Sequence, residues 1–340
     1  MGVLIYLVLP PFDFPSHVFE LIVVLSAEHH VFYNDNNTNW SVHISHVLTS
    51  PYNYTPTESV AIIFLVLFSI STIFHIFAAL RYRLWWLIPT ACLAATGEVI
   101  GWAGRLWSSQ NVLANDPFMM QIVCTIIAPT PFVAAIFILF GHLVRRLGEG
   151  YSMISARWYS RIFLTCDLIA LFIQAVGGGI ASSANTVAGT NLGATIMQVG
   201  IIIQLIALVI FMFLFVEFFG HFLRDRPFSF KRGAGRSTAT LVSSREAWTG
   251  RVKLFTISLA FSTFVLFIRA IYRTIELSDG WNGPVISTQK WFNIFDGTMV
   301  VLALYSMNIF HPGYMLFNQP FPSDLHEMQR KDATVDTLSA

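Results

Sequence analysis

Charged residues are scarce in this chain of 340 residues, because Asp, Glu, Lys and Arg together make up only 11% of it. Soluble domains carry about 25% charged residues, so the composition excludes an ordinary soluble domain. Hydrophobic residues account for 55% of the chain, and Phe alone occurs 31 times. These values predict an integral membrane protein with most of its length in lipid. The net charge of +1 gives no reason to expect a nucleic-acid partner.

Cysteine is also rare, since the chain has only Cys92, Cys124 and Cys166, all within apolar runs. We therefore expect no secreted disulfide framework and interpret the three as small, packed apolar residues. The chain lacks the G-x-x-x-x-G-K-[ST] motif that binds nucleoside triphosphates. ATP-driven pumping by this chain alone is not expected, and the sequence indicates no cofactor.

Seven long apolar runs predict an all-α fold. Each run reaches about 20 residues, enough to cross a bilayer core of ~30 Å as a helix. We expect a polytopic bundle of seven transmembrane helices within residues 58–319. The runs are 58–80, 85–105, 118–143, 162–182, 193–219, 254–275 and 291–310.

Sequons and basic residues predict the orientation of the bundle. Three Asn-x-Ser/Thr sequons, at Asn36, Asn39 and Asn53, precede the first run and are candidate glycosylation sites, which places residues 1–57 on the extracellular or lumenal side. With the N-terminus outside, 16 of the 20 Lys and Arg residues fall on cytoplasmic connections, their flanks or the tail. This positive-inside bias agrees with the sequons and predicts a cytoplasmic C-terminus.

The segments outside the apolar runs are interpreted from composition. Residues 1–27 are apolar but interrupted by prolines and an Asp, so a cleaved signal peptide, a surface-lying segment and an incorrect start codon all stay open. Residues 220–251 form a basic loop rich in Ser, Thr and Gly. It is either a topology determinant or a flexible, phosphorylatable connection for a cytoplasmic regulator. Residues 320–340 are polar and predict a disordered cytoplasmic tail.

Ionisable residues inside the apolar runs are the main functional signal. In the sixth run, Arg269, Arg273 and Glu276 have helical spacing on one face. A charge at the bilayer centre costs about 2.5–3.5 kcal/mol on insertion scales, so such groups face a protein interior or a wet cavity. The predicted topology places possible partners at the same, outer depth, and these are Glu98, Arg105 and Asp296.

The fourth run carries a second polar face. Asp167 and Gln174 are seven residues apart on one helix face, and 177–179 is a run of three glycines that permits either close packing or a helix break. In the third run, Pro129 and Pro131 predict a kink, because each removes a backbone donor.

Two interpretations of the six outer groups stay open. The first is an ion-pair network that only fixes helix register. The second is a polar cavity, open to the outer leaflet, that holds the head group of an amphiphile. In that case the Arg residues suit phosphate or carboxylate, whereas Glu98 and Asp296 suit an amine.

Several motifs, in order, resemble the fungal RTA-type proteins, a lipid-translocating exporter family named for resistance to aminocholesterol. The resemblance covers about 52–317. The matching motifs are Tyr52-x-Tyr54-x-Pro56, Glu98-x-x-Gly101-Trp102-x-x-Arg105, Ala128-Pro129, Asp167, Gln174-Ala175-x-Gly177-Gly178-Gly179, Gly200-x-x-x-Gln204, Arg269-x-x-Tyr272-Arg273-x-x-Glu276, Phe295-Asp296 and His311-Pro312-Gly313.

The resemblance implies a membrane protein, not an enzyme, that moves sphingoid long-chain bases or phospholipids between leaflets. It further implies tolerance to lipid stress and to toxic sterol analogues or azoles, and a place in the plasma membrane or, alternatively, in vacuolar or other internal membranes. The chain departs from the family at Trp102, where Tyr is usual, and at Gln289-Lys290, where Glu is usual before the last span. The second departure removes a carboxylate at the outer rim.

Two other functions are compatible with seven spans. A receptor or lipid sensor is one, although the third run ends in His142-Leu143-Val144-Arg145-Arg146 rather than in an acidic-Arg-aromatic motif. An intramembrane hydrolase is the other, and its zinc site would need three or four ligands at one depth. The histidines near the inner side, His75, His142 and His311, form no such motif.

Overall fold

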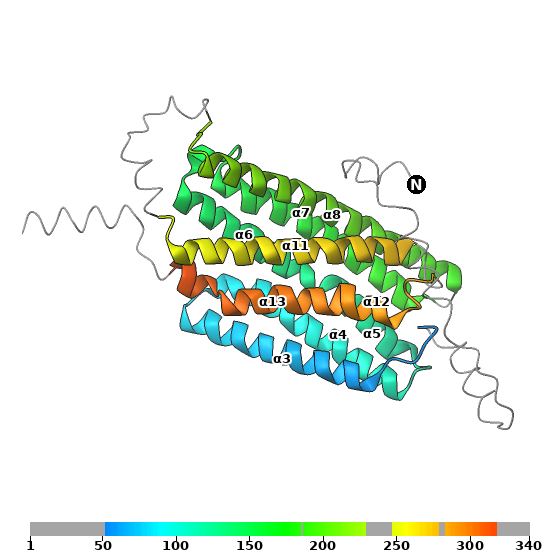
Figure 1. Ribbon diagram of the computed structural model, residues 1–340. Coiled ribbons are helices and arrows are strands. Elements are labelled where there is room, and N and C mark those ends of the chain that lie inside the picture. Colours follow the sequence, from blue (N-terminus) through cyan, green and yellow to red (C-terminus); the bar gives the residue numbers. More distant parts are fainter. Residues whose placement is uncertain (1–51, 185, 229–246, 279–282, 318–340) are drawn as a thin grey trace, which may run out of the picture. The chain divides into compact units, whose positions relative to one another are not determined.

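The computed structural model describes residues 52–184, 186–228, 247–278 and 283–317, and every regular element in these ranges is a helix (Figure 1). Seven helical spans in these ranges are long and apolar enough to cross a membrane, which confirms the predicted all-α, seven-span architecture. The spans are Glu58–Arg81, Trp85–Gln110, Asn115–Leu147, Ala156–Ser183, Val187–Leu223, Gly250–Ser278 and Gln289–Phe317. The sequons at Asn36 and Asn39, loop residues 229–246 and the tail 320–340 lie outside the described residues.

Four of the spans are single α-helices and three are composite. The single helices are α3 (Glu58–Arg81), α7 (Ala156–Ser183), α8 (Val187–Leu223) and α11 (Gly250–Ser278). The second span joins a 3-10 turn (Trp85–Leu87), a π-helical turn (Ile88–Cys92) and α4 (Leu93–Gln110). The third joins α5 (Asn115–Ile127) to α6 (Pro129–Leu147), and the seventh joins α12 (Gln289–Phe292), a π-helical segment (Asn293–Thr298), α13 (Met299–Ile309) and a second π-helical segment (Gly313–Phe317).

The helices extend beyond the apolar runs that predict them. The largest difference is at the fifth span, where the run 193–219 lies inside the longer helix α8. Residues such as Thr190 and His221 are too polar for the apolar run but continue the helix, because helical hydrogen bonds satisfy the backbone in lipid and at the interface alike. Apolar length therefore underestimates helix length.

The third span is interrupted where its sequence predicts a kink. Pro129 has no backbone N–H to donate, and the helix divides there into α5, ending at Ile127, and α6, beginning at Pro129. The division lies at the predicted position, and the bend itself stays a prediction.

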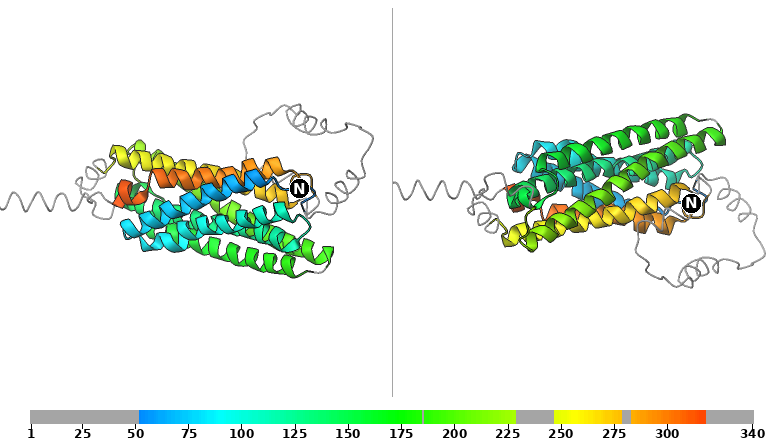
Figure 2. Two further views of the ribbon diagram at one scale, coloured as in Figure 1. Left: turned by 90° about the horizontal axis from the view of Figure 1, so that it is seen from below. Right: turned by 90° about the horizontal axis from the view of Figure 1, so that it is seen from above.

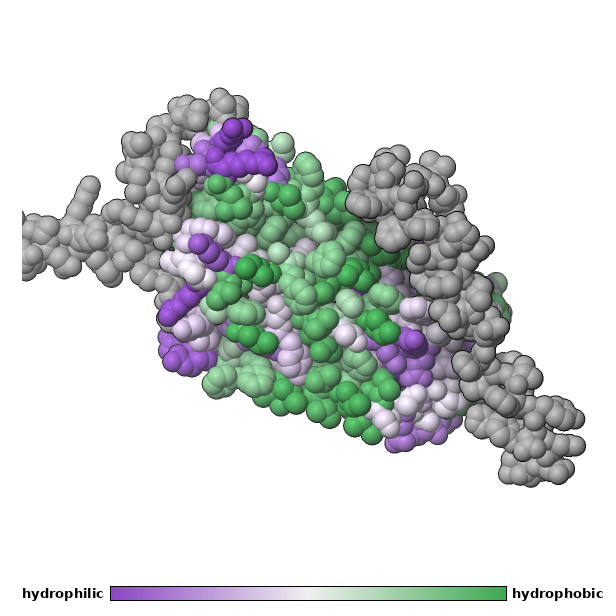
Figure 3. Space-filling model, in the orientation of Figure 1, coloured by the Kyte–Doolittle hydropathy of each residue, from purple (hydrophilic) through white to green (hydrophobic). Residues whose placement is uncertain are grey.

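The surface is apolar where lipid would contact it. Figure 3 shows hydrophobic side chains across the middle of one face, with hydrophilic side chains toward its two ends. Large side chains such as Ile73, Phe77, Phe172 and Val216 are more than 60% exposed. Their exposure to water would be costly, so this belt is suited to acyl chains.

Short connections bring consecutive helices side by side. Helix α4 packs against α3 and α5, α7 packs against α6 and α8, and α11 contacts α13, α8 and α6 (Figures 1 and 2). These contacts place α11 between α13 on one side and α6 and α8 on the other. The polar face of α11 is consequently surrounded by protein.

The glycines of α7 produce close packing and no break. Helix α7 is continuous through 177–179. A Cβ at Gly177 would lie 2.6 Å from the Met197 backbone nitrogen, and one at Gly193 would lie 2.5 Å from that of Ala181. Of the two alternatives that the sequence leaves open, the structure therefore shows the packing of α7 against α8.

Candidate functional site

The polar face of α11 is buried in the bundle. Arg269, Arg273 and Glu276 are 8%, 1% and 1% exposed, in agreement with their predicted position on one face. Charged groups so deeply buried require partners, since desolvation of each costs several kcal/mol. The surrounding helices supply these partners.

Arg273 and Asp296 form the centre of an ionic cluster that we define as Arg269, Arg273, Glu276 and Asp296. The Arg273 Nε donates to Asp296 Oδ1 at 2.8 Å, and its Nη2 donates to Oδ2 at 2.7 Å. Its Nη1 donates to Glu276 Oε2 at 2.6 Å, while Tyr272 donates its hydroxyl to Oε1 of the same carboxylate at 2.8 Å. Parallel bonds between a guanidinium and a carboxylate fix geometry as well as charge.

Arg269 is the second cation of the ionic cluster. Its Nε lies 2.9 Å from Asp296 Oδ1, and its Nη2 donates to the backbone carbonyl of Thr125. Asp296 thus lies between two guanidinium groups from successive turns of α11. The single carboxylate joins the seventh span to the sixth.

Local backbone structure positions Asp296 for this role. The residue lies in the π-helical segment Asn293–Thr298, and such segments often occur at functional sites. The next residue, Gly297, allows a close approach, because a Cβ there would lie 2.6 Å from the Trp102 ring. Trp102 itself is stacked on Phe64 at 4.1 Å between ring centroids.

Helix α5 contributes acceptors that the sequence does not reveal. The Thr125 Oγ1 accepts a hydrogen bond from Arg273 Nη2 at 2.8 Å, in addition to the carbonyl contact with Arg269. Helix α4 also packs closely against Thr125, because a Cβ at Gly101 would lie only 2.7 Å from Thr125 Cγ2. The spacing of Gly97 and Gly101 indicates this packing, but no sequence signal identifies the carbonyl as an acceptor.

Arg105 is buried, but its contacts are neutral. Its Nη1 donates to Gln121 Oε1 at 3.2 Å, and its Nη2 donates to the Tyr54 hydroxyl at 3.0 Å. Its guanidinium also lies over aromatic rings, with the Phe292 centroid 4.5 Å away. No ion pair of Arg105 occurs among the described residues, so it stands apart from the ionic cluster that it was expected to join.

Tyr52 lies beside Arg105, just before the first span, and is 4% exposed. Its hydroxyl donates to Ser108 Oγ at 2.9 Å. Burial raises the pKa of this phenol above its ordinary value, so it stays neutral. The segment before α3 is thereby attached to the end of α4.

Glu98 is fully buried and close enough to Arg269, Arg273 and Asp296 to interact with their charges. The described residues offer neither of its carboxylate oxygens a hydrogen bond of ordinary geometry, although the indole N–H of Trp102 is one turn away on α4. A buried carboxylate without hydrogen bonds is costly when ionised. This feature distinguishes Glu98 from Glu276 and Asp296.

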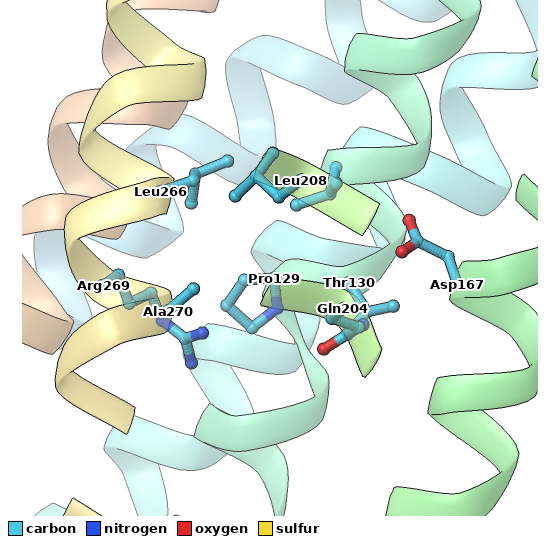
Figure 4. A pocket seen from close by; sticks show the side chains of 9 residues that line it. Pro129, Thr130, Asp167, Gln204, Leu208, Leu266, Arg269 and Ala270 are labelled. Atoms are coloured by element: carbon cyan, nitrogen blue, oxygen red, sulfur yellow. The ribbon is translucent and has the colours of Figure 1, made fainter. Parts of the chain in front are cut away.

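A cavity of about 30 Å³ lies between α6, α7, α8 and α11. Arg269 and Asp167 lie on opposite sides of it, with Thr130 and Gln204 between them (Figure 4). The complete lining is Pro129, Thr130, Val133, Asp167, Gln204, Leu208, Leu266, Arg269 and Ala270. The cavity therefore joins the ionic cluster on α11 to the polar face of α7, which the sequence treats as separate features.

A chain of hydrogen bonds crosses the helices beside this cavity. Gln174 Nε2 donates to Gln204 Oε1 at 2.7 Å, and Gln204 Nε2 donates to Thr130 Oγ1 at 2.8 Å. Gln174 is fully buried, and its Oε1 has no hydrogen-bond partner in the described ranges. The same holds for Oδ2 of Asp167, which is 2% exposed. On the α7 side, the cavity thus offers Asp167 Oδ2 as an acceptor to which no described residue donates a hydrogen bond.

The described residues do not gather metal ligands. No group of three His, Cys, Asp or Glu side chains that could hold a metal ion occurs within ranges 52–184, 186–228, 247–278 and 283–317. The polar side chains of the ionic cluster and of the cavity instead carry guanidinium, carboxylate, amide and hydroxyl groups. Their chemistry is suited to binding polar head groups through hydrogen bonds and charge.

Comparison with known proteins gives a consistent result. A family model described as "RTA1 like protein" matches residues 91–319. The sphingoid long-chain base transporter RSB1 of Saccharomyces cerevisiae is 29% identical over 270 residues, which cover 74% of this chain and 70% of that protein. No solved structure matches the chain.

Two further relatives come from the same yeast. Protoporphyrin uptake protein 1 is 26% identical over 293 residues, or 76% of this chain and 90% of that protein. Protein RTM1 is 27% identical over 207 residues, or 61% of each chain. One of these three relatives is named as a transporter of sphingoid long-chain bases and another for the uptake of protoporphyrin, and none is named as an enzyme.

Proposed function

The chain belongs to the RTA1-like family, and we propose that it moves amphiphilic lipids, such as sphingoid long-chain bases or phospholipids, between the leaflets of a membrane. The family match agrees with the resemblance seen in the sequence motifs. A relative named as a long-chain base transporter supports the substrate class. The finer substrate choice rests on the site itself.

The position of Arg269 carries the proposal. This side chain pairs with Asp296 and also borders the cavity that contains Asp167. A group that only fixed helix register would need the ion pair alone. Contact with a polar cavity gives the ionic cluster access to a head group, while the apolar outer surface accommodates the tail.

The size of the cavity implies movement during transport. About 30 Å³ holds two or three water-sized groups, since one water needs about 10–15 Å³. A phosphate ester is larger, so the described conformation is closed to it. The helix division at Ala128 and the π-helical segment around Asp296 are positions where the spans can bend.

We further propose the orientation and location that the sequence predicts. The N-terminal segment 1–57 lies outside, the basic loop 220–251 and the tail 320–340 are cytoplasmic, and the plasma membrane is the site of action. Glycosylation outside, regulation through the loop and tolerance to lipid stress or toxic sterols and azoles belong to the same proposal. Its support is the sequons and the positive-inside bias.

Flux measurement in reconstituted vesicles tests the proposal. The full chain is inserted into phosphatidylcholine vesicles that contain a fluorescently labelled sphingoid base in both leaflets, and dithionite added outside bleaches the exposed label. We expect the protected label to reach the outer leaflet faster than in protein-free vesicles. We also expect Arg269→Gln to lower that rate at least ten-fold.

Arg224→Gln is the matched control, because Arg224 is exposed and lies at the end of α8, away from the cavity lining. It should preserve the flux. Equal rates with and without protein would reject lipid translocation. Normal flux in Arg269→Gln, with normal incorporation into vesicles, would reject the role given to the ionic cluster.

A further inference from the structure

Four carboxylates lie buried in or beside the ionic cluster and the cavity, but they differ in the hydrogen bonds that their oxygens accept. Both oxygens of Asp296 accept hydrogen bonds from Arg273, and Oδ1 also faces Arg269. Both oxygens of Glu276 accept hydrogen bonds, from Tyr272 and from Arg273. These two carboxylates have their counter-charge within the protein.

The other two carboxylates, Glu98 and Asp167, have buried oxygens without hydrogen-bond partners in the part of the chain described. Only Asp167 borders the cavity. Leaving a carboxylate in a low-dielectric interior without a partner costs several kcal/mol, so it binds a proton or a cation. Space for a cation exists next to Asp167.

We infer that Asp167 receives the primary ammonium group of an amphiphile in the cavity between α6, α7, α8 and α11. This inference deepens the proposed function and rests on it. It places the amine on the α7 side of the cavity, whereas the sequence favours Glu98 and Asp296 for that role. The reason is that Asp296 is already paired and Glu98 does not reach the lining.

The chemistry of the cavity agrees with an ammonium group. Such a group has three N–H donors and no acceptor, and the site offers Asp167 Oδ2 as a free acceptor beside the Thr130 hydroxyl and the Gln204 amide. Gln204 is held in place by its bonds to Gln174 and Thr130. The nearby charge of Arg269 is balanced by Asp296, 2.9 Å away, so it does not exclude a second cation.

The volume of the cavity selects among head groups. An ammonium group is about the size of a water molecule, and about 30 Å³ accommodates it together with one hydroxyl. A trimethylated nitrogen exceeds this space and cannot donate hydrogen bonds. The site therefore predicts discrimination between primary and quaternary amines of equal charge and chain length.

Competition binding tests the inference. The full chain in phosphatidylcholine nanodiscs binds a tritiated sphingoid base at pH 7, and octadecylamine, octadecanol or octadecyltrimethylammonium competes at equal mole fraction. We expect octadecylamine to compete at least ten-fold better than the other two. Asp167→Asn should weaken octadecylamine binding at least ten-fold, and Asp116→Asn, at an exposed position, should change it less than two-fold.

Several outcomes would overturn the inference. Equal competition by octadecanol would show that the site does not recognise charge. Equal competition by the trimethylated amine would show that the site recognises neither the size of the head group nor its N–H donors. Both results come from the unmodified protein, so they do not depend on the folding of a variant. Unchanged octadecylamine binding in Asp167→Asn would place the amine elsewhere.

The flux assay separates this inference from the proposed function. Normal flux of the labelled base with unselective amine binding rejects the ammonium site but not translocation. Selective binding that depends on Asp167, without any protein-dependent flux, rejects translocation but not the site.

Discussion

Asp296 accepts two parallel hydrogen bonds from Arg273, at 2.8 and 2.7 Å, and both side chains are almost completely buried. One residue lies on the sixth span and the other on the seventh, so the pair joins two helices across the bundle interior. Arg269 adds a second cation to the same carboxylate. The stability of this part of the bundle therefore depends on a small set of charges.

Removal of Arg273 should destabilise the protein strongly. Arg273→Met leaves Asp296 with one cation and Glu276 with only the Tyr272 hydroxyl, and breaking a buried pair costs about 3–5 kcal/mol. Arg273→Lys keeps the charge but loses the parallel bonds, so its loss should be intermediate. Unfolding in SDS–detergent mixtures measures both, with Arg224→Met at an exposed site as the control. A loss below 1 kcal/mol in Arg273→Met would contradict the geometry.

Thr125 should matter through its hydroxyl. Thr125→Val removes the acceptor for Arg273 Nη2 while it keeps the shape of the side chain. A hydrogen bond to a charged group contributes about 1.5–3 kcal/mol, and the free energy of unfolding should fall by that amount. Thr165→Val, at an exposed position on α7, serves as the control. The prediction fails if the two variants are equally stable.

Substitution of Glu98 should lower transport activity without lowering the stability of the protein. Glu98→Gln removes a buried carboxylate whose oxygens accept no hydrogen bond from the described residues, so the melting temperature should stay the same or rise. The same change removes a carboxyl group that can release and rebind a proton beside Arg269 and Arg273, and lipid flux should fall at least ten-fold if transport uses that proton. Melting of the detergent-solubilised protein and the vesicle assay provide the two measurements. A variant that is both less stable and fully active would contradict both expectations.

Close packing of α7 on α8 should be sensitive to a single methyl group. Gly177→Ala places a Cβ 2.6 Å from a backbone nitrogen of α8, and overpacking of this kind costs about 1–3 kcal/mol. Gly179→Ala has open space at the same helix and should stabilise or leave unchanged the free energy of unfolding. Melting temperatures of the two variants measure the difference. If both were equally stable, the helices would not approach as closely as described.

The three sequons should not be used equally. The Asn53 Nδ2, the atom that would carry a glycan, donates a hydrogen bond to Ser287 Oγ at 3.1 Å, and Asn53 is only five residues before α3. We therefore expect glycans at Asn36 and Asn39 but not at Asn53. Glycosidase treatment of protein expressed in yeast should shift the unmodified chain and Asn53→Gln equally. The double variant Asn36→Gln/Asn39→Gln should show no shift, and a residual shift would contradict the expectation.

Patterns of single residue types predict much of this architecture. Apolar length predicts seven spans, and Pro129 marks the position where the third span divides. Helical spacing on the sixth run predicts that Arg269, Arg273 and Glu276 share a buried face. These features are local in sequence, so no knowledge of helix packing is needed to infer them.

Features that depend on which helices pack together could not be predicted from the sequence. The role of Thr125 depends partly on its backbone carbonyl, which every residue possesses. Arg105 finds a phenol, an amide and aromatic rings where the sequence suggests carboxylates, because pairing depends on which helices become neighbours. The shared cavity of Arg269 and Asp167 was missed for the same reason, since these residues are about a hundred positions apart.

The π-helical segment around Asp296 has a consequence for the evolution of such chains. A π turn contains one residue more than an α turn, so deleting a single codon within 293–298 would restore an ordinary helix. Because the extra residue is contained in one wide turn, the helix downstream would keep nearly the same orientation about its axis. Ala303 and Met307 would still contact Ser262 and Ser258 of α11, and only the side chains within the segment, Asp296 among them, would change direction. Relatives with a one-residue gap at this point should therefore keep the downstream contacts but place the carboxylate differently.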